Sequence, residues 1–496
     1  MLHGNGWSFF MPAKKNNKPD SFSVFQSPQV LVQKSKGKTV PVYLIYEKDF
    51  NDWLSSQTEA AQSSLLAQGF KGGANNVTLT YSSGKIEAVY VGLGKRIGLY
   101  SFAYAVDQIM KSSTEELYNT EFEIQKNDLS KSDLEKLCIG WSLAAYKFDR
   151  YKSNTKKFPR LILPKNANKA RIESFVQSIS LIRNLINTPA NDMGPDELAD
   201  AAGQLASFQK ANIKFVEDRK LLDQNFPLIH AVGHGSERRP RLIDITWGNG
   251  KHPKLTIVGK GVCFDTGGLD IKPSAAMLMM KKDMGGSAMA LGLAWMIISQ
   301  NLPVRLRVLI PAVENSISGI AFRPGDVFPS RKGLSVEIGN TDAEGRLVMA
   351  DCLTLACEEN PDLLIDFSTL TGAARTALGF DIPAMFSNND EIASELQKIS
   401  LDVEDPLWQL PLWAPYKADI TSSIADLNNA GNNPAGSITA ALFLENFISD
   451  NTDWVHIDHY AWEASGKPGR PRGGADTGMR AVFAYLEKRY ESKKKK

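Results

Sequence analysis

The chain has 496 residues, of which 43% are hydrophobic and 23% are charged, so it can bury a large core and form two or three domains. Its 57 basic and 55 acidic residues leave a net charge of +2, which gives no electrostatic support for a nucleic-acid or membrane partner. It contains no run of about eighteen apolar residues that could span a bilayer.

Residues 1–30 are expected to form a flexible N-terminal arm. They lack a basic segment followed by a long apolar stretch, so they make a poor signal peptide, and Met11 is a candidate for the true start. The cysteines are far apart, with no CxxC pair, which favours free thiols in a reducing cytosol and a cytoplasmic protein. They are Cys138, Cys263, Cys352 and Cys357.

Residues 31–165 have the pattern of a small α/β domain. A strand is expected at 40–46, and a hairpin at 77–81 and 86–91, where two strand-like runs flank a Ser-Ser-Gly-Lys turn. Helical periodicity follows at 101–111 and 133–148, and a short strand at 160–163.

A linking helix is predicted within 166–190, and it ends where Pro189 disfavours helical geometry in Thr188. In residues 191–496 strands alternate with helices, so we expect a larger α/β domain with a mostly parallel sheet flanked by helices. Ligands bind at the carboxyl ends of the strands in such sheets. Strands are expected at 213–216, 242–247, 255–260, 304–313 and 363–368, and helices at 195–209, 284–300, 346–359 and 390–401.

Two turn-rich segments, 258–283 and 340–351, carry charged side chains where these strands end. If residues 342–344 are extended, the two carboxylates there point to one side. Carboxylate oxygens suit a divalent cation, and two ions about 3.5–4 Å apart need a bridging carboxylate. The charged residues are Lys260, Asp265, Lys272, Asp283, Asp342, Glu344 and Arg346.

Each of these residues also has a structural interpretation. Asp283 could cap a helix, and Thr341 with Glu344 fits a capping box. Asp265 could close a turn with the glycines after it, and Lys260 could reach solvent along its alkyl stem. Spacing alone leaves the metal site and these structural roles equally open.

The histidines offer a rival metal site. His230 and His234 have HxxxH spacing, but no glutamate follows the first, and we expect a strand and turn there rather than a metal-binding helix. His456 and His459 lie in a strand-like segment, where residues three apart face opposite sides. Neither pair is predicted to hold a metal.

NTDAEGRL at 340–347, GKGVCFDTGG at 259–268 with the IKP that follows, and KKDMGG at 281–286 together resemble the signature of the leucyl aminopeptidase (cytosol aminopeptidase) family, the M17 metallopeptidases. The resemblance covers about residue 175 to the C-terminus and implies that 191–496 is the catalytic domain. Segment 456–474 departs from the family pattern, so it leaves the side-chain preference open.

The resemblance implies roles for individual positions. The metal ligands would be Lys260, Asp265, Asp283, Asp342 and Glu344. Lys272 and Arg346 would be catalytic. The pocket for the first side chain of the substrate would be lined by Met280, Thr369, Gly372 and Ala373.

The implied function is a metal-dependent aminopeptidase that acts on peptides with a free N-terminus and releases leucine-like and other unbranched or apolar residues. Two divalent ions, Zn²⁺ and/or Mn²⁺ with Mg²⁺ as an option in one site, would activate water, and Arg346 would hold bicarbonate. The family resemblance also implies a homohexamer. The alternatives are a DNA-binding protein on the same scaffold, which the near-neutral charge does not favour, and a catalytically silent scaffold, which the complete set of charged residues disfavours.

Overall fold

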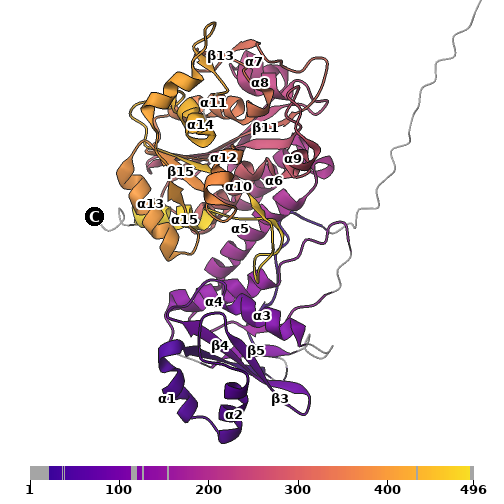
Figure 1. Ribbon diagram of the computed structural model, residues 1–496, viewed down its shortest axis with the longest axis vertical. Coiled ribbons are helices and arrows are strands. Elements are labelled where there is room, and N and C mark those ends of the chain that lie inside the picture. The colour runs from indigo at the N-terminus through magenta and orange to yellow at the C-terminus, as the bar shows by residue number, and fades with distance from the viewer. Residues whose placement is uncertain are drawn as a thin grey trace, which may run out of the picture.

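The computed structural model describes residues 22–491 except 36, 38, 113–119, 126–127, 153–155 and 432–433. Figure 1 shows a smaller N-terminal unit, coloured indigo to purple, beside a larger unit that runs from magenta to yellow. Helix α5 (Lys169–Asn187) packs against both α4 (Lys131–Ala144) of the first unit and α10 (Gly285–Ser299) of the second. The two units are therefore joined by a packed helix.

The N-terminal unit is built on a six-stranded sheet in the order β1-β6-β5-β2-β4-β3, in which only β3 and β4 are antiparallel. Ser83 and Gly84 join these two strands with positive φ, as a tight hairpin turn requires, so the predicted hairpin is confirmed. The strands are β1 (Leu31–Val32), β2 (Thr39–Tyr46), β3 (Val77–Ser82), β4 (Lys85–Gly94), β5 (Glu121–Ile124) and β6 (Arg160–Ile162). Its other helices are α1 (Phe50–Ser55), α2 (Glu59–Ala67) and α3 (Ser101–Lys111).

The larger unit contains a nine-stranded sheet in the order β16-β15-β18-β14-β9-β11-β8-β7, with β10 also paired to β11. Its centre is parallel, from β18 through β14 and β9 to β11, and the antiparallel pairs lie towards its edges. The predicted mostly parallel sheet is confirmed. The strands are β7 (Asn212–Glu217), β8 (Arg241–Trp247), β9 (Lys254–Gly259), β10 (Gly261–Asp265), β11 (Arg305–Asn315), β14 (Leu363–Ser368), β15 (Ala384–Ser387), β16 (Trp408–Gln409) and β18 (Trp454–Asp458).

Helices cover both faces of this sheet, as predicted. Leu255 and Ile257 of β9 belong to the same buried cluster as α10, whereas Val258 packs in the cluster that contains α11 (Glu344–Cys357). Successive side chains of a strand point to opposite faces, so α10 and α11 lie on opposite sides. The other main helices are α6 (Pro195–Gln209), α13 (Asp390–Asp402), α14 (Gly436–Glu445) and α15 (Met479–Glu491).

Three local expectations were wrong. Strand β10 was not predicted; it runs from Gly261 to Asp265, and the expected turn follows it. The segment expected as strand and turn around His230 is the short helix α8 (Pro227–Gly233). Residues 341–343 form the 3-10 turn η5 (Thr341–Ala343), which leads directly into α11 instead of being extended. The remaining short elements include α7 (Arg219–Asp223), α9 (Ser274–Met277), α12 (Gly372–Leu378), η4 (Met280–Lys282), β12 (Val327–Pro329), β13 (Ser335–Glu337), β17 (Leu427–Asn428), β19 (Trp462–Glu463) and β20 (Gly473–Gly474).

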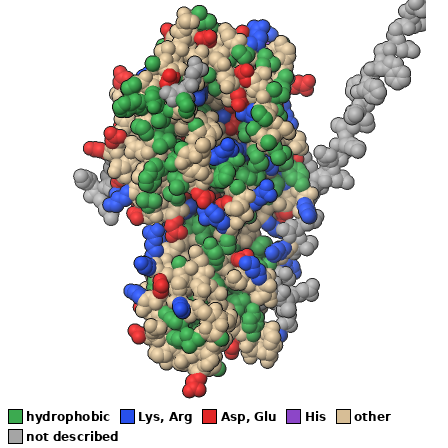
Figure 2. All heavy atoms as spheres, in the orientation of Figure 1, with side chains coloured by type: hydrophobic (Ala, Val, Ile, Leu, Met, Phe, Trp, Pro, Cys, Tyr) green, Lys and Arg blue, Asp and Glu red, His purple; other side chains and the backbone are tan. Residues whose placement is uncertain are grey.

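Residues 22–30 of the predicted arm pack onto α5, where the Asn184 amide donates to the carbonyls of Val24 and Gln26 at 2.9 and 3.0 Å. Residues 1–21, which include Met11, lie outside the described residues. All four cysteines are free and buried, as expected. Basic and acidic side chains are interspersed over the face seen in Figure 2. Within the described ranges, no helix is long and apolar enough to cross a bilayer.

Candidate metal centre

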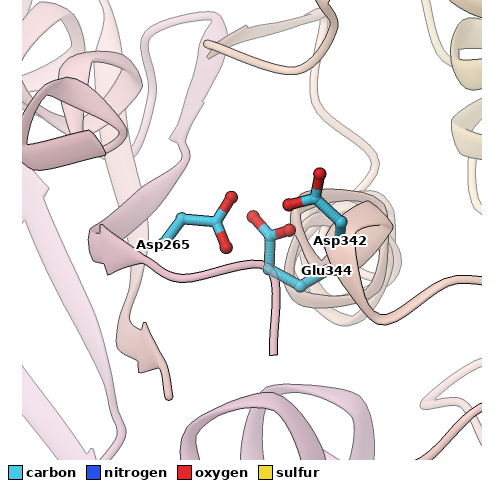
Figure 3. Close-up of side chains that lie close together, drawn as sticks. All are labelled: Asp265, Asp342 and Glu344. Carbon is cyan, nitrogen blue, oxygen red and sulfur yellow. The ribbon is translucent and has the colours of Figure 1, made fainter. Parts of the chain in front are cut away.

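The predicted ligands meet at the carboxyl ends of the central strands. Lys260 connects β9 to β10, Asp265 ends β10, and Asp283 lies between η4 and α10. Asp342 belongs to η5, and Glu344 begins α11. Figure 3 shows the carboxylates of Asp265, Asp342 and Glu344 converging from the strand end and the helix start, and ligand oxygens of all three lie within 4.8 Å of one another.

Two lysines join these carboxylates into one cluster. Lys260 Nζ lies 2.6 Å from Asp283 Oδ2 and 2.9 Å from Glu344 Oε1. Lys272 Nζ lies 2.8 Å from Asp265 Oδ2 and also contacts Asp342 Oδ1. The structure thus brings together all five predicted ligands and one of the two predicted catalytic residues.

The cluster is mostly buried, with Asp342 the one carboxylate that is partly exposed, and it carries an excess of negative charge. Its four carboxylates face two ammonium groups, and Asp265 and Glu344 are no more than 2% exposed. Burial, reinforced by the charge of Asp265, raises the pKa of Asp342 to about 6 and that of Glu344 well above its usual value. Divalent cations would offset this excess, and an oxygen-rich donor set with one amine fits them.

Lys260 is not the surface lysine of the structural alternative, because only 3% of it is exposed. Burial alone would lower its pKa, but the charges of Asp283 and Glu344 outweigh burial and raise the pKa. Neighbouring dications would act in the opposite direction and favour the neutral amine. The position therefore suits either an ion-paired ammonium or, with metal present, an amine ligand.

The helix-capping alternatives are wrong, whereas the turn alternative is correct. Met284, not Asp283, occupies the N-cap of α10. The Thr341 hydroxyl donates to the Gly267 carbonyl at 2.6 Å instead of capping a helix. Asp265 Oδ1 does accept from the Gly267 N–H at 2.9 Å, so this carboxylate closes a turn while its other oxygen faces Lys272.

Asn315, at the end of β11, belongs to the site although the sequence did not single it out. Its amide donates to Asp265 Oδ1 at 2.9 Å and to the Thr341 carbonyl at 3.0 Å, and the residue is fully buried. Asn315 therefore ties the two ligand-bearing segments together. The signal that could have found it was the pairing of β10 with β11, which requires β10 to be recognised first.

Arg346 projects from the first turn of α11. Its Nη1 donates to the Asn429 carbonyl at 2.5 Å, and burial lowers its pKa to about 10, although Asp458 and Glu344 act in the opposite direction. Asn429 also accepts from the N–H of Gly339 at 2.8 Å, which fixes the loop before η5. No sequence pattern pointed to Asn429.

The residues expected to line the substrate pocket border the cluster. Thr369 follows β14 and donates to Asp283 Oδ1 at 2.7 Å, and Gly372 and Ala373 begin α12 shortly after it. Met280 begins η4, three residues before Asp283. Another residue that the sequence did not reveal, Asp458, accepts from Leu370 N–H at 2.9 Å and Thr371 hydroxyl at 2.6 Å and thereby holds this loop.

The two histidine pairs considered as a rival metal site lie in other surroundings. His230 and His234 stack at 4.9 Å between ring centroids, and His456 Nδ1 lies 2.6 Å from Asp366 Oδ1 in the core. His459 is buried after the end of β18. Among the described residues, Asp265, Asp342 and Glu344 form the one group of three close acidic, histidine or cysteine ligands.

Family models match both units: the catalytic-domain model of the cytosol aminopeptidase family matches residues 180–483, and the M17 aminopeptidase N-terminal domain model matches residues 40–164. A probable cytosol aminopeptidase of Syntrophotalea carbinolica is 41% identical over 71% of this chain and 74% of the relative. A probable cytosol aminopeptidase of Chlamydia caviae is 37% identical over 84% of this chain and 89% of the relative.

Solved structures agree with these sequence relatives. The crystal structure of cytosol aminopeptidase from Coxiella burnetii superposes with a TM-score of 0.86 at 44% identity, covering 93% of this chain and 99% of that one. The structure of the bottromycin maturation enzyme BotP in complex with Mn superposes with a TM-score of 0.80 at 27% identity, covering 92% of this chain and 100% of that one.

Fold, cluster and relatives together define a hydrolase, a metallo-exopeptidase of the leucyl aminopeptidase type. The chain belongs to the cytosol aminopeptidase family, as its sequence motifs indicated.

Proposed function

We propose that the protein uses two divalent ions to release leucine-like and other unbranched or apolar N-terminal residues from peptides. The observation that carries this proposal is the buried cluster in which Lys260 joins Asp283 to Glu344 and Lys272 joins Asp265 to Asp342. Three buried carboxylates and a partly exposed fourth, with only two ammonium partners, are poorly stable by themselves, so the group favours cation binding.

The five proposed metal ligands are Lys260, Asp265, Asp283, Asp342 and Glu344. Zn²⁺ and/or Mn²⁺ are the proposed ions, with Mg²⁺ as an option in one site. The oxygen-rich donor set tolerates different metals, and the related BotP was solved with Mn. When bound, such ions lower the pKa of water and polarise a substrate carbonyl.

The protein's own side chains would divide the remaining tasks. Asp283, which accepts a hydrogen bond from Thr369, would bind the free α-amine of the peptide, and this would restrict cleavage to the first residue. The Lys272 ammonium would stabilise the oxyanion that develops on the carbonyl. Arg346 would hold bicarbonate, whose planar oxygens match the guanidinium fork, and this ion would carry the proton from water to the leaving amine.

The pocket for the first side chain of the substrate is proposed to be lined by Met280, Thr369, Gly372 and Ala373. The support is their position: Thr369 hydrogen-bonds Asp283, Met280 precedes Asp283 by three residues, and the other two begin the helix after Thr369. A side chain attached to a carbon beside the bound amine must lie next to Asp283.

We further propose that the chain has domains at 31–165 and 191–496, joined by a linking helix at 166–190. We also propose that it forms a homohexamer and acts in peptide turnover in the cytoplasm. Light scattering of the purified protein tests the assembly. DNA binding on the same scaffold remains the alternative function, and a gel shift at physiological salt tests it.

The decisive experiment is hydrolysis of leucine and methionine p-nitroanilides by the metal-loaded protein, with and without a chelator. We expect hydrolysis that chelation abolishes and Zn²⁺ or Mn²⁺ restores. Absence of hydrolysis by protein shown to contain metal would overturn the proposal. Anomalous scattering from crystals would count the ions and identify their ligands.

A further inference from the structure

Lys282 is a buried lysine beside the metal cluster for which the proposed chemistry has no use. Only 4% of its surface is exposed, and its Nζ lies 4.6 Å from the centroid of the Tyr460 ring. Within the described residues its ammonium forms neither a hydrogen bond nor an ion pair. The adjacent Lys281 differs, because its Nζ donates to the Asn187 carbonyl at 2.7 Å.

Two carboxylates, those of Asp283 and Asp458, lie close enough for their charges to act on Lys282, but both have other partners. Asp283 accepts from Thr369 and contacts Lys260, as described above. Asp458 accepts from the backbone N–H groups of Leu370 and Thr371 and from the Thr371 hydroxyl. Neither carboxylate therefore forms an ion pair with the Lys282 ammonium.

A second cation shares the same aromatic ring. The guanidinium carbon of Arg375, on α12, lies 5.3 Å from the Tyr460 centroid, and Phe380 packs against that ring at 4.8 Å between centroids. Arg375 is exposed and, like Lys282, pairs with no carboxylate among the residues that the structure describes. Two cations without acidic partners thus flank Tyr460.

These cations border the region proposed for the first residue of the substrate. Lys282 lies between the proposed pocket residue Met280 and the proposed amine-binding Asp283, and Arg375 lies two residues after Ala373. A buried ammonium without a counterion is costly, and a ligand carboxylate would remove that cost. The Tyr460 ring supplies only a weaker cation–π contact.

We propose that Lys282, assisted by Arg375, binds a carboxylate on the side chain of the substrate's first residue, so that the enzyme prefers N-terminal glutamate to its neutral isostere glutamine. This inference rests on the proposed aminopeptidase function and specifies its substrate class. The glutamate side chain is unbranched, so its shape fits the preference for unbranched first residues proposed above.

The test compares kcat/KM for glutamate and glutamine p-nitroanilides, in which the side chain of the glutamate substrate is the sole source of a carboxylate. For the metal-loaded wild-type enzyme we expect a glutamate-to-glutamine ratio of roughly 10 or more, as for a hydrogen bond to a charged group. In Lys282→Met the ratio should fall to about 1, whereas Lys282→Arg should retain most of the preference.

Lys281→Met is the matched control, because it removes the neighbouring ammonium that already has a partner, and it should keep the wild-type ratio. A wild-type enzyme that cleaves leucine p-nitroanilide but handles glutamate no better than glutamine overturns the proposal and leaves the aminopeptidase function intact. Failure to cleave any of the three substrates overturns the aminopeptidase function itself.

Should Lys282→Met fail to fold, as judged by circular dichroism, Arg375→Gln provides the second test because Arg375 is exposed. We expect this variant to lower the glutamate-to-glutamine ratio by a smaller factor, through KM more than kcat. An unchanged ratio in Arg375→Gln would remove Arg375 from the proposal. A preference that persists in folded Lys282→Met would refute the assignment to Lys282.

Discussion

The side-chain amide of Asn315 donates to Asp265 Oδ1 at 2.9 Å, and this one contact orients a proposed metal ligand from a neighbouring strand. The same amide donates to the Thr341 carbonyl, so it also fixes the turn that carries Asp342. Asn315 therefore connects the two charged segments, 258–283 and 340–351, although it belongs to neither.

Asn315→Ala should therefore weaken metal binding by about 10- to 100-fold, as removal of a partner that orients a ligand typically does. The measurement is a titration of the metal-free protein with Zn²⁺ or Mn²⁺, and excess metal should restore activity. Asn249→Ala is the control, because Asn249 is exposed and accepts only from its own turn, at the N–H of Lys251. Unchanged affinity in Asn315→Ala would refute the orienting role.

Lys272→Met should keep the metal content near normal while lowering kcat by roughly 100-fold or more, the expected cost of losing an oxyanion-stabilising donor. Methionine preserves the length of the side chain and removes the charge. Metal analysis of the purified variant accompanies the kinetics. Loss of metal would instead show that Lys272 maintains the carboxylates that it contacts, Asp265 and Asp342.

Arg346→Met should abolish stimulation by bicarbonate. In buffer freed of carbon dioxide, we expect added bicarbonate to raise the wild-type rate and to leave the variant rate unchanged. The contact with the Asn429 carbonyl holds the Arg346 guanidinium in place. The Arg346→Lys variant lacks the planar fork, so bicarbonate should stimulate it only weakly. Equal stimulation of wild type and Arg346→Met would exclude bicarbonate binding at this residue.

The central sheet and the charged cluster were predictable because both have strong local signals. The apolar runs of β9 and β14 mark buried strands, and the motifs after β9 and before α11 place charged residues at the strand ends. Burial of Lys260 was not predictable from spacing, because a lysine at a strand end can also reach solvent along its alkyl stem, and only its contact with Asp283 decides between the two.

The positioning residues were not predictable, since their roles depend on contacts between segments far apart in sequence. Asn315 and Asp458 end strands and look like ordinary polar residues until the strands are paired. The geometry of Asp342 and Glu344 was predicted wrongly, because a single 3-10 turn before a helix has no periodicity to distinguish it from an extended segment.

Metal affinity should rise with pH, and Lys260 should account for part of that rise. Without metal, Asp283 and Glu344 raise the pKa of Lys260 above its usual value, so the side chain carries its proton throughout pH 6 to 9. An amine ligand must release that proton, which adds about one unit to the slope of log affinity against pH. Asp342, whose pKa is about 6, acts in the same direction but only near or below that pH.

Lys260→Met has no proton to release, so its slope should be smaller than that of wild type by about one. Metal affinity is measured by competition with a chromogenic chelator at pH 6.5, 7.5 and 8.5. Steps of about one pH unit are enough to resolve a difference of one in the slope. The metal-free variant should also be less stable by about 3–5 kcal/mol, because two buried carboxylates lose their ammonium partner. Lys272→Met should keep the wild-type slope between pH 7.5 and 8.5, since it leaves Lys260 in place. Equal slopes in wild type and Lys260→Met would mean that Lys260 remains an ammonium when metal is bound, and that it acts as an ion-pair partner instead of a ligand.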